Sequence, residues 1–223
     1  MKRSEVNKII KDAKTMFDKF SFRLPEWADW TPEDWAAKGH ECDEIRENSL
    51  GWDITDFGSG DFGKVGLTLV TIRNGNVNKG GKTYCEKIMA VGVGQKTPAH
   101  FHWFKTEDII NRGGGTFCQQ MWKADEKTEE KLDVPFTVKV DGVERTLQPG
   151  EILRLHPGQS VTNEPYVYHE FWAEGEPCMV GEVSKVNDDA NDNRFYNPTG
   201  RFPAIEEDEK PFRLLCNEYP AVK

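Results

Sequence analysis

The sequence lacks a long hydrophobic run and any excess of positive charge. Crossing a bilayer takes about 18 or more consecutive apolar residues, and no such run occurs. The opening MKRSEVNKII is charged and has no apolar signal core, so we expect a cytoplasmic protein. A formal net charge of −9 opposes nucleic acid or an anionic membrane as a partner, which leaves small molecules as the expected ligands.

The five cysteines are scattered, are odd in number and form no CxxC pair. This usage argues against a disulfide framework and fits reduced thiols in a cytosolic protein. The cysteines are Cys42, Cys85, Cys118, Cys178 and Cys216.

Two kinds of pattern divide the chain near residue 50. Apolar residues in 4–20 recur at helical spacing, and Thr31-Pro32-Glu33-Asp34 has the composition of a helix start. After residue 50 come short β-branched or aromatic runs bounded by turn residues, and Asp141-Gly142 predicts a tight hairpin. We therefore predict a single, mainly β domain: a helical arm at 1–45 and an antiparallel β-barrel body at 50–220.

Three of the five histidines predict a metal site. His100 and His102 are two residues apart in a predicted strand, so their imidazoles point to the same face. Glu107 follows five residues after His102, and His169 begins a later strand that can close the site from across a barrel. Three imidazoles and one carboxylate suit Mn, Fe, Co, Ni or Zn, so the metal's identity is left open.

The spacing around these residues resembles the cupin motifs. Gly94 to Gly114 matches every fixed position of the first motif, G-x5-HxH-x4-E-x6-G. The second motif, G-x5-PxGxxH-x3-N, is matched at Gly158 and His169 but departs from the usual Pro, Gly and Asn. The resemblance implies a cupin fold, which is a double-stranded β-helix or jelly-roll barrel.

A more extensive resemblance covers nearly the whole chain. The segments LGWDITDFG, GLTLVTIRNG, EDIINRGGG, GEVSKVNDD and LCNEY are similar to the D-lyxose ketol-isomerase family of bacterial cupins. The resemblance implies manganese dependence and interconversion of D-lyxose with D-xylulose, with D-mannose and D-fructose as further candidate sugars. Homodimerisation is common among cupins and is expected here by that analogy.

Two charged residues that interrupt apolar strand patterns are our candidates for catalysis. Glu182 in MVGEVS and Lys87 in CEKIMAV are both predicted to face the barrel interior. Aldose–ketose isomerisation moves hydrogen between C1 and C2, and a carboxylate such as Glu182 can shuttle the proton. Lys87 can donate to a sugar hydroxyl or stabilise an oxyanion.

Three further residues are predicted to contact substrate: Lys105, Arg112 and Asp188. Arg112 lies in NRGGG, which we expect to be a tight turn between strands. Asp188 lies in the oxygen-rich loop 187–193, which we expect to cover the barrel mouth.

Two other functions use the same ligands. An Fe(II) cupin dioxygenase would consume oxygen, and a non-catalytic sugar-binding cupin would show no metal-dependent turnover. The segments shared with the isomerases and the acidic net charge favour the isomerase.

Overall fold

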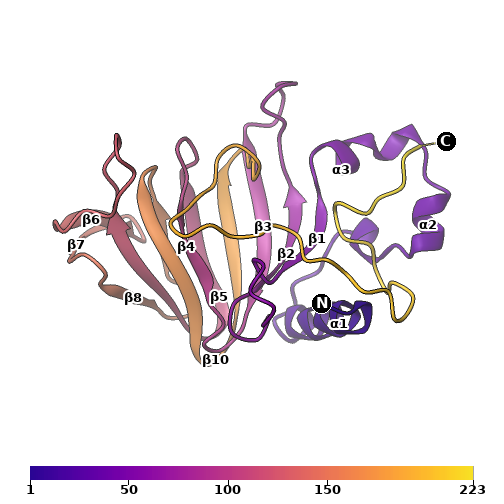
Figure 1. The fold of residues 1–223 in the computed structure, drawn as a ribbon, viewed down its shortest axis with the longest axis horizontal. Coiled ribbons are helices and arrows are strands. Elements are labelled where there is room, and N and C mark those ends of the chain that lie inside the picture. Colours follow the sequence, from indigo (N-terminus) through magenta and orange to yellow (C-terminus); the bar gives the residue numbers. More distant parts are fainter. Residues whose placement is uncertain (223) are drawn as a thin grey trace.

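The computed structural model describes residues 1–222 and consists of a helical N-terminal segment followed by eleven strands (Figure 1). The helices are α1 (Arg3–Lys19), α2 (Pro32–Ala36) and α3 (Asp43–Glu47), with 3-10 turns η1 (Glu26–Asp29) and η2 (His40–Cys42). The strands are β1 (Gly51–Thr55), β2 (Leu67–Arg73), β3 (Tyr84–Val91), β4 (Thr97–Phe101), β5 (Glu107–Lys123), β6 (Phe136–Val140), β7 (Val143–Leu147), β8 (Ile152–Leu155), β9 (Ser160–Asn163), β10 (Val167–Lys185) and β11 (Arg194–Phe195). The prediction of a mainly β protein with a helical N-terminal arm is confirmed.

The eleven strands are hydrogen-bonded into one continuous sheet, which is folded into two halves, each called a sheet. The two longest strands, β5 and β10, run antiparallel and pass through both. In one sheet the order is β1-β2-β3-β10-β5-β9-β6-β7, and in the other β4 and β8 flank the same two strands, with β11 beyond β4. The first part of β10 pairs with β4 and its last part with β3. Side chains on the inner faces of β5 and β10 therefore point into the space between the two sheets.

The NRGGG segment lies inside β5, so the prediction of a turn between two strands is wrong. Its glycines form a bend where the pairing of β5 with β10 shifts register. A Cβ on Gly114 would lie 2.1 Å from the Pro177 carbonyl oxygen, and one on Gly115 would lie 2.3 Å from that of Glu174. The glycines allow the two backbones to come this close, and β5 can thus pass from one sheet to the other.

The predicted hairpin at Asp141-Gly142 is confirmed. Both residues have positive φ, 51° and 79°, as a type I′ turn requires. This turn joins β6 to β7 in antiparallel register. The short runs HEFWA and CMVGEV, which a glycine and a proline separate in the sequence, are two halves of β10.

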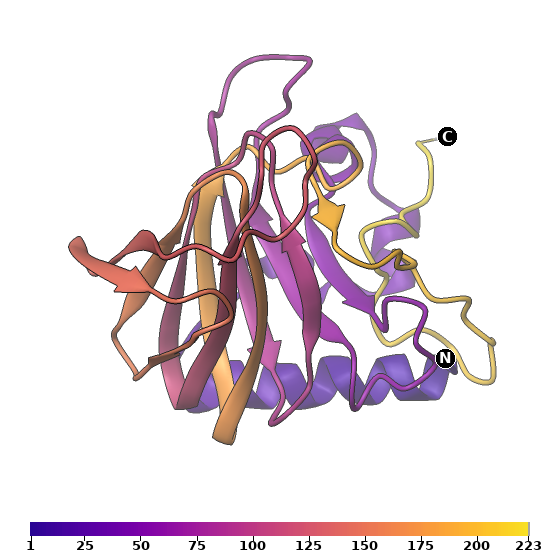
Figure 2. The same ribbon diagram turned by 60° about the vertical axis from the view of Figure 1, so that its left-hand side comes forward.

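The protein has two apolar cores, one on each face of the β1–β3 part of the sheet. One fills the space between the two sheets and includes Met89, Phe117 and Val180. The other lies on the outer face of β1–β3, where α1 packs with Val6, Ile10 and Phe17 against strand residues (Figure 2). Residues 203–222 (yellow in Figure 1) run along this helical side. No helix within residues 1–222 is long and apolar enough to cross a membrane.

Candidate metal centre and catalytic pocket

The residues predicted to bind metal meet in a cavity of about 60 Å³ between the two sheets. His100 lies on β4, His102 directly after it, Glu107 at the start of β5 and His169 on β10. All four side chains are buried. His100 and His169 are register partners on the adjacent strands β4 and β10, with ring centroids 4.2 Å apart. The prediction that His169 closes the site from across the barrel is therefore wrong: it lies beside His100, because β4 and β10 pair directly.

The three imidazoles are arranged as a metal site requires. One ring nitrogen from each lies within 4.8 Å of one from each of the others. Each Nδ1–H donates to a backbone carbonyl: His100 to Pro98 (2.9 Å), His102 to Asp192 (2.5 Å) and His169 to Val167 (3.0 Å). These hydrogen bonds fix the tautomer and leave every Nε2 with its lone pair free, as in metal-ligating histidines.

Two of these nitrogens are buried atoms in need of a partner. Within the described part of the chain, Nε2 of His102 and Nε2 of His169 make no hydrogen bond. Glu107 oxygens lie 3.4 Å from the first and 3.1 Å from the second, without hydrogen-bond geometry. A buried polar atom is costly to leave unpaired, and a cation between these nitrogens and the carboxylate would satisfy all of them. The donor set therefore fits a divalent metal.

The charge states favour this use. Burial, reinforced by His169 and His102, lowers the pKa of His100 well below its usual value, so its imidazole stays neutral. Burial opposes ionisation of Glu107, but Lys105 and His102 hold the pKa of its carboxyl well below the usual range. A neutral imidazole and an ionised carboxylate are the forms that bind metals.

Beside the histidines, two buried lysines enclose Glu182. Nζ of Lys87 lies 3.2 Å from Glu182 Oε1, and Nζ of Lys105 lies 3.0 Å from the same oxygen. Lys105 also contacts Glu107 Oε2 at 2.9 Å, which connects this group to the predicted ligands. Burial raises the pKa of Glu182, but Lys105 and Lys87 outweigh it and the net pKa is lowered. The two ammonium groups thus hold Glu182 in its ionised form.

The segment 186–202 forms part of the wall and contributes residues that the sequence did not point to. Asp189, Asn193, Phe195 and Arg201 line the same cavity. Asp188, which we had predicted, does not: it hydrogen-bonds Asn191 and faces a neighbouring cavity. The oxygen-rich loop 187–193 thus contributes to both cavities, but which of its residues faces which cavity has no signal in the sequence.

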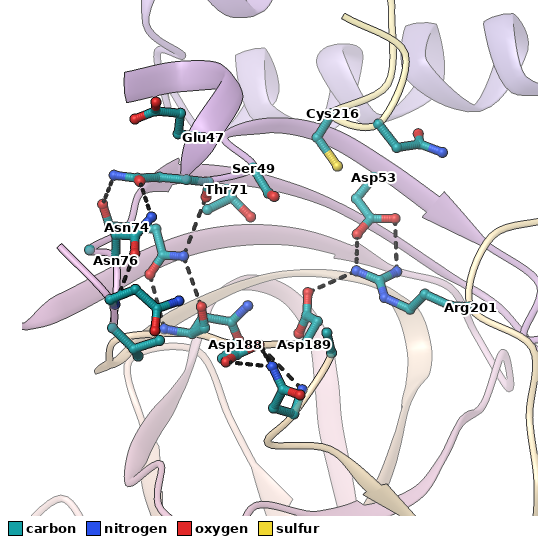
Figure 3. A pocket seen from close by; sticks show the side chains of 18 of the residues that line it. Glu47, Ser49, Asp53, Thr71, Asn74, Asn76, Asp188, Asp189, Arg201 and Cys216 are labelled. Atoms are coloured by element: carbon teal, nitrogen blue, oxygen red, sulfur yellow. Dashed lines mark hydrogen bonds and ion pairs between the residues drawn. The ribbon is translucent and has the colours of Figure 1, made fainter. Parts of the chain in front are cut away.

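The neighbouring cavity is larger, about 390 Å³, and shares Asp189 and Arg201 with the histidine pocket (Figure 3). Arg201 donates to Asp53 Oδ1 at 3.1 Å and to Asp189 Oδ2 at 2.8 Å. Because Asp189 and Arg201 line both cavities, their ion pair stands between the two.

The side-chain amides of the larger cavity bond to backbone carbonyls: Asn48 donates to the Asn74 carbonyl, and Asn74 donates to the Asn187 carbonyl.

Arg112 is not brought into either cavity. It lies exposed on β5, where its side chain covers Gly181 on the outer face of β10. Because strand residues alternate between faces, Arg112 points away from the side on which Asn111 is buried. Of the nine predicted site residues, seven line the histidine cavity: His100, His102, Glu107, His169, Glu182, Lys87 and Lys105.

The fold is shared with solved sugar-isomerase structures. L-ribose isomerase from Acinetobacter sp. DL28, in complex with L-ribose, superposes with a TM-score of 0.62 at 16% identity, over 92% of this chain and 98% of that one. L-ribose isomerase from Geodermatophilus obscurus gives 0.63 at 17% over the same shares. At this identity the likeness concerns the fold alone. The barrel, with its pocket between the two sheets, is a cupin-type fold.

The sequence comparisons give the family. The family model described as D-lyxose isomerase matches residues 1–219. A D-lyxose/D-mannose isomerase from Serratia proteamaculans is 46% identical over 227 residues, and one from Escherichia coli O157:H7 is 45% identical over 225. Each alignment covers 98% of both chains. The chain belongs to the D-lyxose isomerase family, and it is therefore an isomerase.

Proposed function

We propose that this protein interconverts D-lyxose and D-xylulose, and also D-mannose and D-fructose, with a divalent metal held by His100, His102, Glu107 and His169. The observation that carries the proposal is the set of imidazoles with free Nε2 atoms beside a buried carboxylate, in contact with the Lys105–Glu182–Lys87 group. The names of the two relatives supply the sugars.

The cavity's own residues supply the remaining parts of an isomerisation. A divalent ion bound to this donor set would act as a Lewis acid on the sugar oxygens at C1 and C2. Glu182 takes the proton from C2 of the open-chain aldose and returns it to C1, while the O2 hydroxyl proton passes to O1, so that the carbonyl moves from C1 to C2. Lys87 and Lys105 donate hydrogen bonds to the oxygens on which negative charge develops, inside a pocket that largely excludes water.

The metal, the assembly and the location are proposed from weaker support. A set of three nitrogens and one oxygen accepts Mn²⁺, and the family resemblance favours it over Fe, Co, Ni and Zn. A homodimer rests on the analogy with other cupins. A cytoplasmic location rests on the five thiols, which form no disulfide among the described residues.

The test is D-xylulose formation from D-lyxose by chelator-stripped protein, with and without added Mn²⁺. We expect turnover only with metal. With D-lyxose deuterated at C2, loss of the label to solvent would support proton transfer through Glu182. Metal binding without any turnover on D-lyxose or D-mannose would contradict the proposal, and oxygen uptake in its place would favour a dioxygenase.

A further inference from the structure

Two buried amides lie behind Glu107, on the side away from the cavity's charged groups. Asn163, the last residue of β9, is the register partner of Glu107 on β5, and its Nδ2 donates to Glu107 Oε1 at 3.1 Å. Gln119, further along β5, donates from Nε2 to Asn163 Oδ1 at 2.6 Å. Asn163 is 1% exposed and Gln119 is fully buried. Neither lines the histidine cavity.

The chemistry of these groups fixes the direction of the chain. A carboxylate only accepts hydrogen bonds, so Asn163 must turn its NH₂ toward Glu107 and its carbonyl oxygen toward Gln119. Gln119 must then present its own NH₂ to that oxygen. The orientation of each amide therefore follows from the carboxylate at the end of the chain.

The arrangement is unfavourable for packing alone. The register partners of Gln119 are Leu153 and Phe171, and both belong to the apolar core. Within the described residues, Gln119 Oε1 has no hydrogen-bond partner at all. A pair of apolar side chains would fill this space without leaving a polar atom unpaired, so stability does not account for the two amides.

The position of the two amides behind Glu107 explains why they are buried there. Glu107 Oε1, which accepts from Asn163, is also the oxygen 3.1 Å from Nε2 of His169. The other oxygen, Oε2, contacts Nζ of Lys105 at 2.9 Å. The carboxylate is thus held from two opposite sides, by an ammonium group at one oxygen and an amide at the other, and cannot rotate freely.

We propose that Asn163 and Gln119 are positioning residues of the metal centre, which hold the Glu107 carboxylate in the orientation that binds the ion. Asn163 acts directly on Glu107, and Gln119 acts through Asn163. The inference rests on the proposed metal site, but not on which sugar the enzyme converts.

The test is the dissociation constant for Mn²⁺ in Asn163→Leu, in Gln119→Met and in the double variant. Leu has the branched shape of Asn but is bulkier, Met has nearly the length of Gln, and both replacements remove the hydrogen bonds. Outer-shell partners of metal ligands typically contribute about 10–100-fold in affinity, and we expect Asn163→Leu to weaken Mn²⁺ binding by about that factor. Gln119→Met should weaken it less, and the double variant no more than Asn163→Leu, since both act along one chain.

Two controls separate positioning from packing. Gln120→Met removes a neighbouring amide of β5 that bonds the Gly150 carbonyl instead, and it should leave Mn²⁺ affinity unchanged. Thermal unfolding of the metal-free variants reports packing alone. Bound Co²⁺ gives a second readout, because its visible absorption should change in Asn163→Leu if the carboxylate has turned.

An Mn²⁺ affinity of Asn163→Leu within about twofold of the unchanged protein would overturn the proposal, as would equal losses in Asn163→Leu and Gln120→Met. If the unchanged protein binds Mn²⁺ but converts no sugar, the proposed function fails and the positioning role is still decided by affinity. If it binds no divalent metal, both fail.

Discussion

At the scale of single residues, Glu182 is the group on which the proposed chemistry depends. It is the carboxylate nearest the two lysines that is not among the predicted ligands, and its pKa is lowered by both. We expect Glu182→Gln to lower kcat by about 10²–10⁴-fold, because the amide cannot take up a proton. Mn²⁺ affinity and thermal stability should remain close to those of the unchanged protein. The control is Glu176→Gln, which changes an exposed carboxylate of the same strand and should leave kcat unchanged. Near-normal turnover in Glu182→Gln would exclude this role.

Lys87 sets the acidity of Glu182. Burial raises the pKa of Glu182, and Lys105 and Lys87 lower it more than burial raises it. Removing one ammonium group in Lys87→Met must therefore raise the pKa of Glu182. Since only the ionised carboxylate accepts a proton, the acid limb of the pH profile of kcat should move to higher pH. Lys139→Met, an exposed lysine on β6, should leave the limb in place. An unmoved acid limb in Lys87→Met would contradict the assignment.

Residue-level prediction from the sequence succeeds where a short-range rule applies. The alternation of a strand places His100 and His102 together, and it turns Lys87 and Glu182 inward. Asp189, Asn163 and Gln119 reach the site through the docking of a loop or the register of distant strands. No local pattern encodes such contacts, so their roles could not be predicted.

At the scale of elements, the site is built mainly on β5 and β10. Glu107 and Gln119 come from one, and His169 and Glu182 from the other. The sequence predicted the strand character of these segments but divided each into pieces, because glycine usually signals a turn. Here Gly114 and Gly115 allow a bend with close backbone approach. A turn between two strands and a bend within one strand differ only in how the partner strand pairs, and sequence periodicity does not reveal the partner.

Helix α1 supports the sheet from its outer face. Phe17 is 1% exposed and stacks on Trp52 of β1, with ring centroids 6.3 Å apart. We expect Phe17→Ala to lower the free energy of unfolding by about 3–5 kcal/mol, through lost burial and the cavity left behind. Urea denaturation of the metal-free protein measures this free energy. Phe17→Leu is the control and should lower it less than Phe17→Ala.

Activity should distinguish this support from the site itself. Phe17 packs in the outer core, whereas the pocket lies between the sheets, so the folded Phe17→Ala protein should retain its kcat. A large loss of kcat without unfolding would show that the two cores are coupled.

At the scale of the whole molecule, segments far apart in the chain are joined by charge. Arg3 of α1 is buried and bonds Glu207 at 2.7 Å, with a second ion pair to Glu218. Arg201 joins the 186–202 segment to Asp53 of β1 in the same way. The sequence predicted the helical arm and the barrel but not these contacts, because ion pairs between distant segments follow from the completed fold.

The hydrogen bond between His102 and the 186–202 segment would link the proposed metal binding to proteolytic sensitivity. The Asp192 carbonyl accepts the Nδ1–H of His102, and its carboxylate accepts the backbone N–H groups of Phe104 and Lys105. Opening this segment would release an imidazole of the proposed metal site. By thermodynamic reciprocity, bound metal must then disfavour opening to the same extent. Trypsin should therefore cut after Arg194 and Arg201 more slowly with Mn²⁺ than with chelator, while cleavage after Arg145, in the exposed hairpin, proceeds equally in both. If Mn²⁺ changes the cleavage rate at none of the three sites, the segment is held closed independently of the ion. If it slows cleavage only after Arg194 and Arg201, the bound metal stabilises the closed segment.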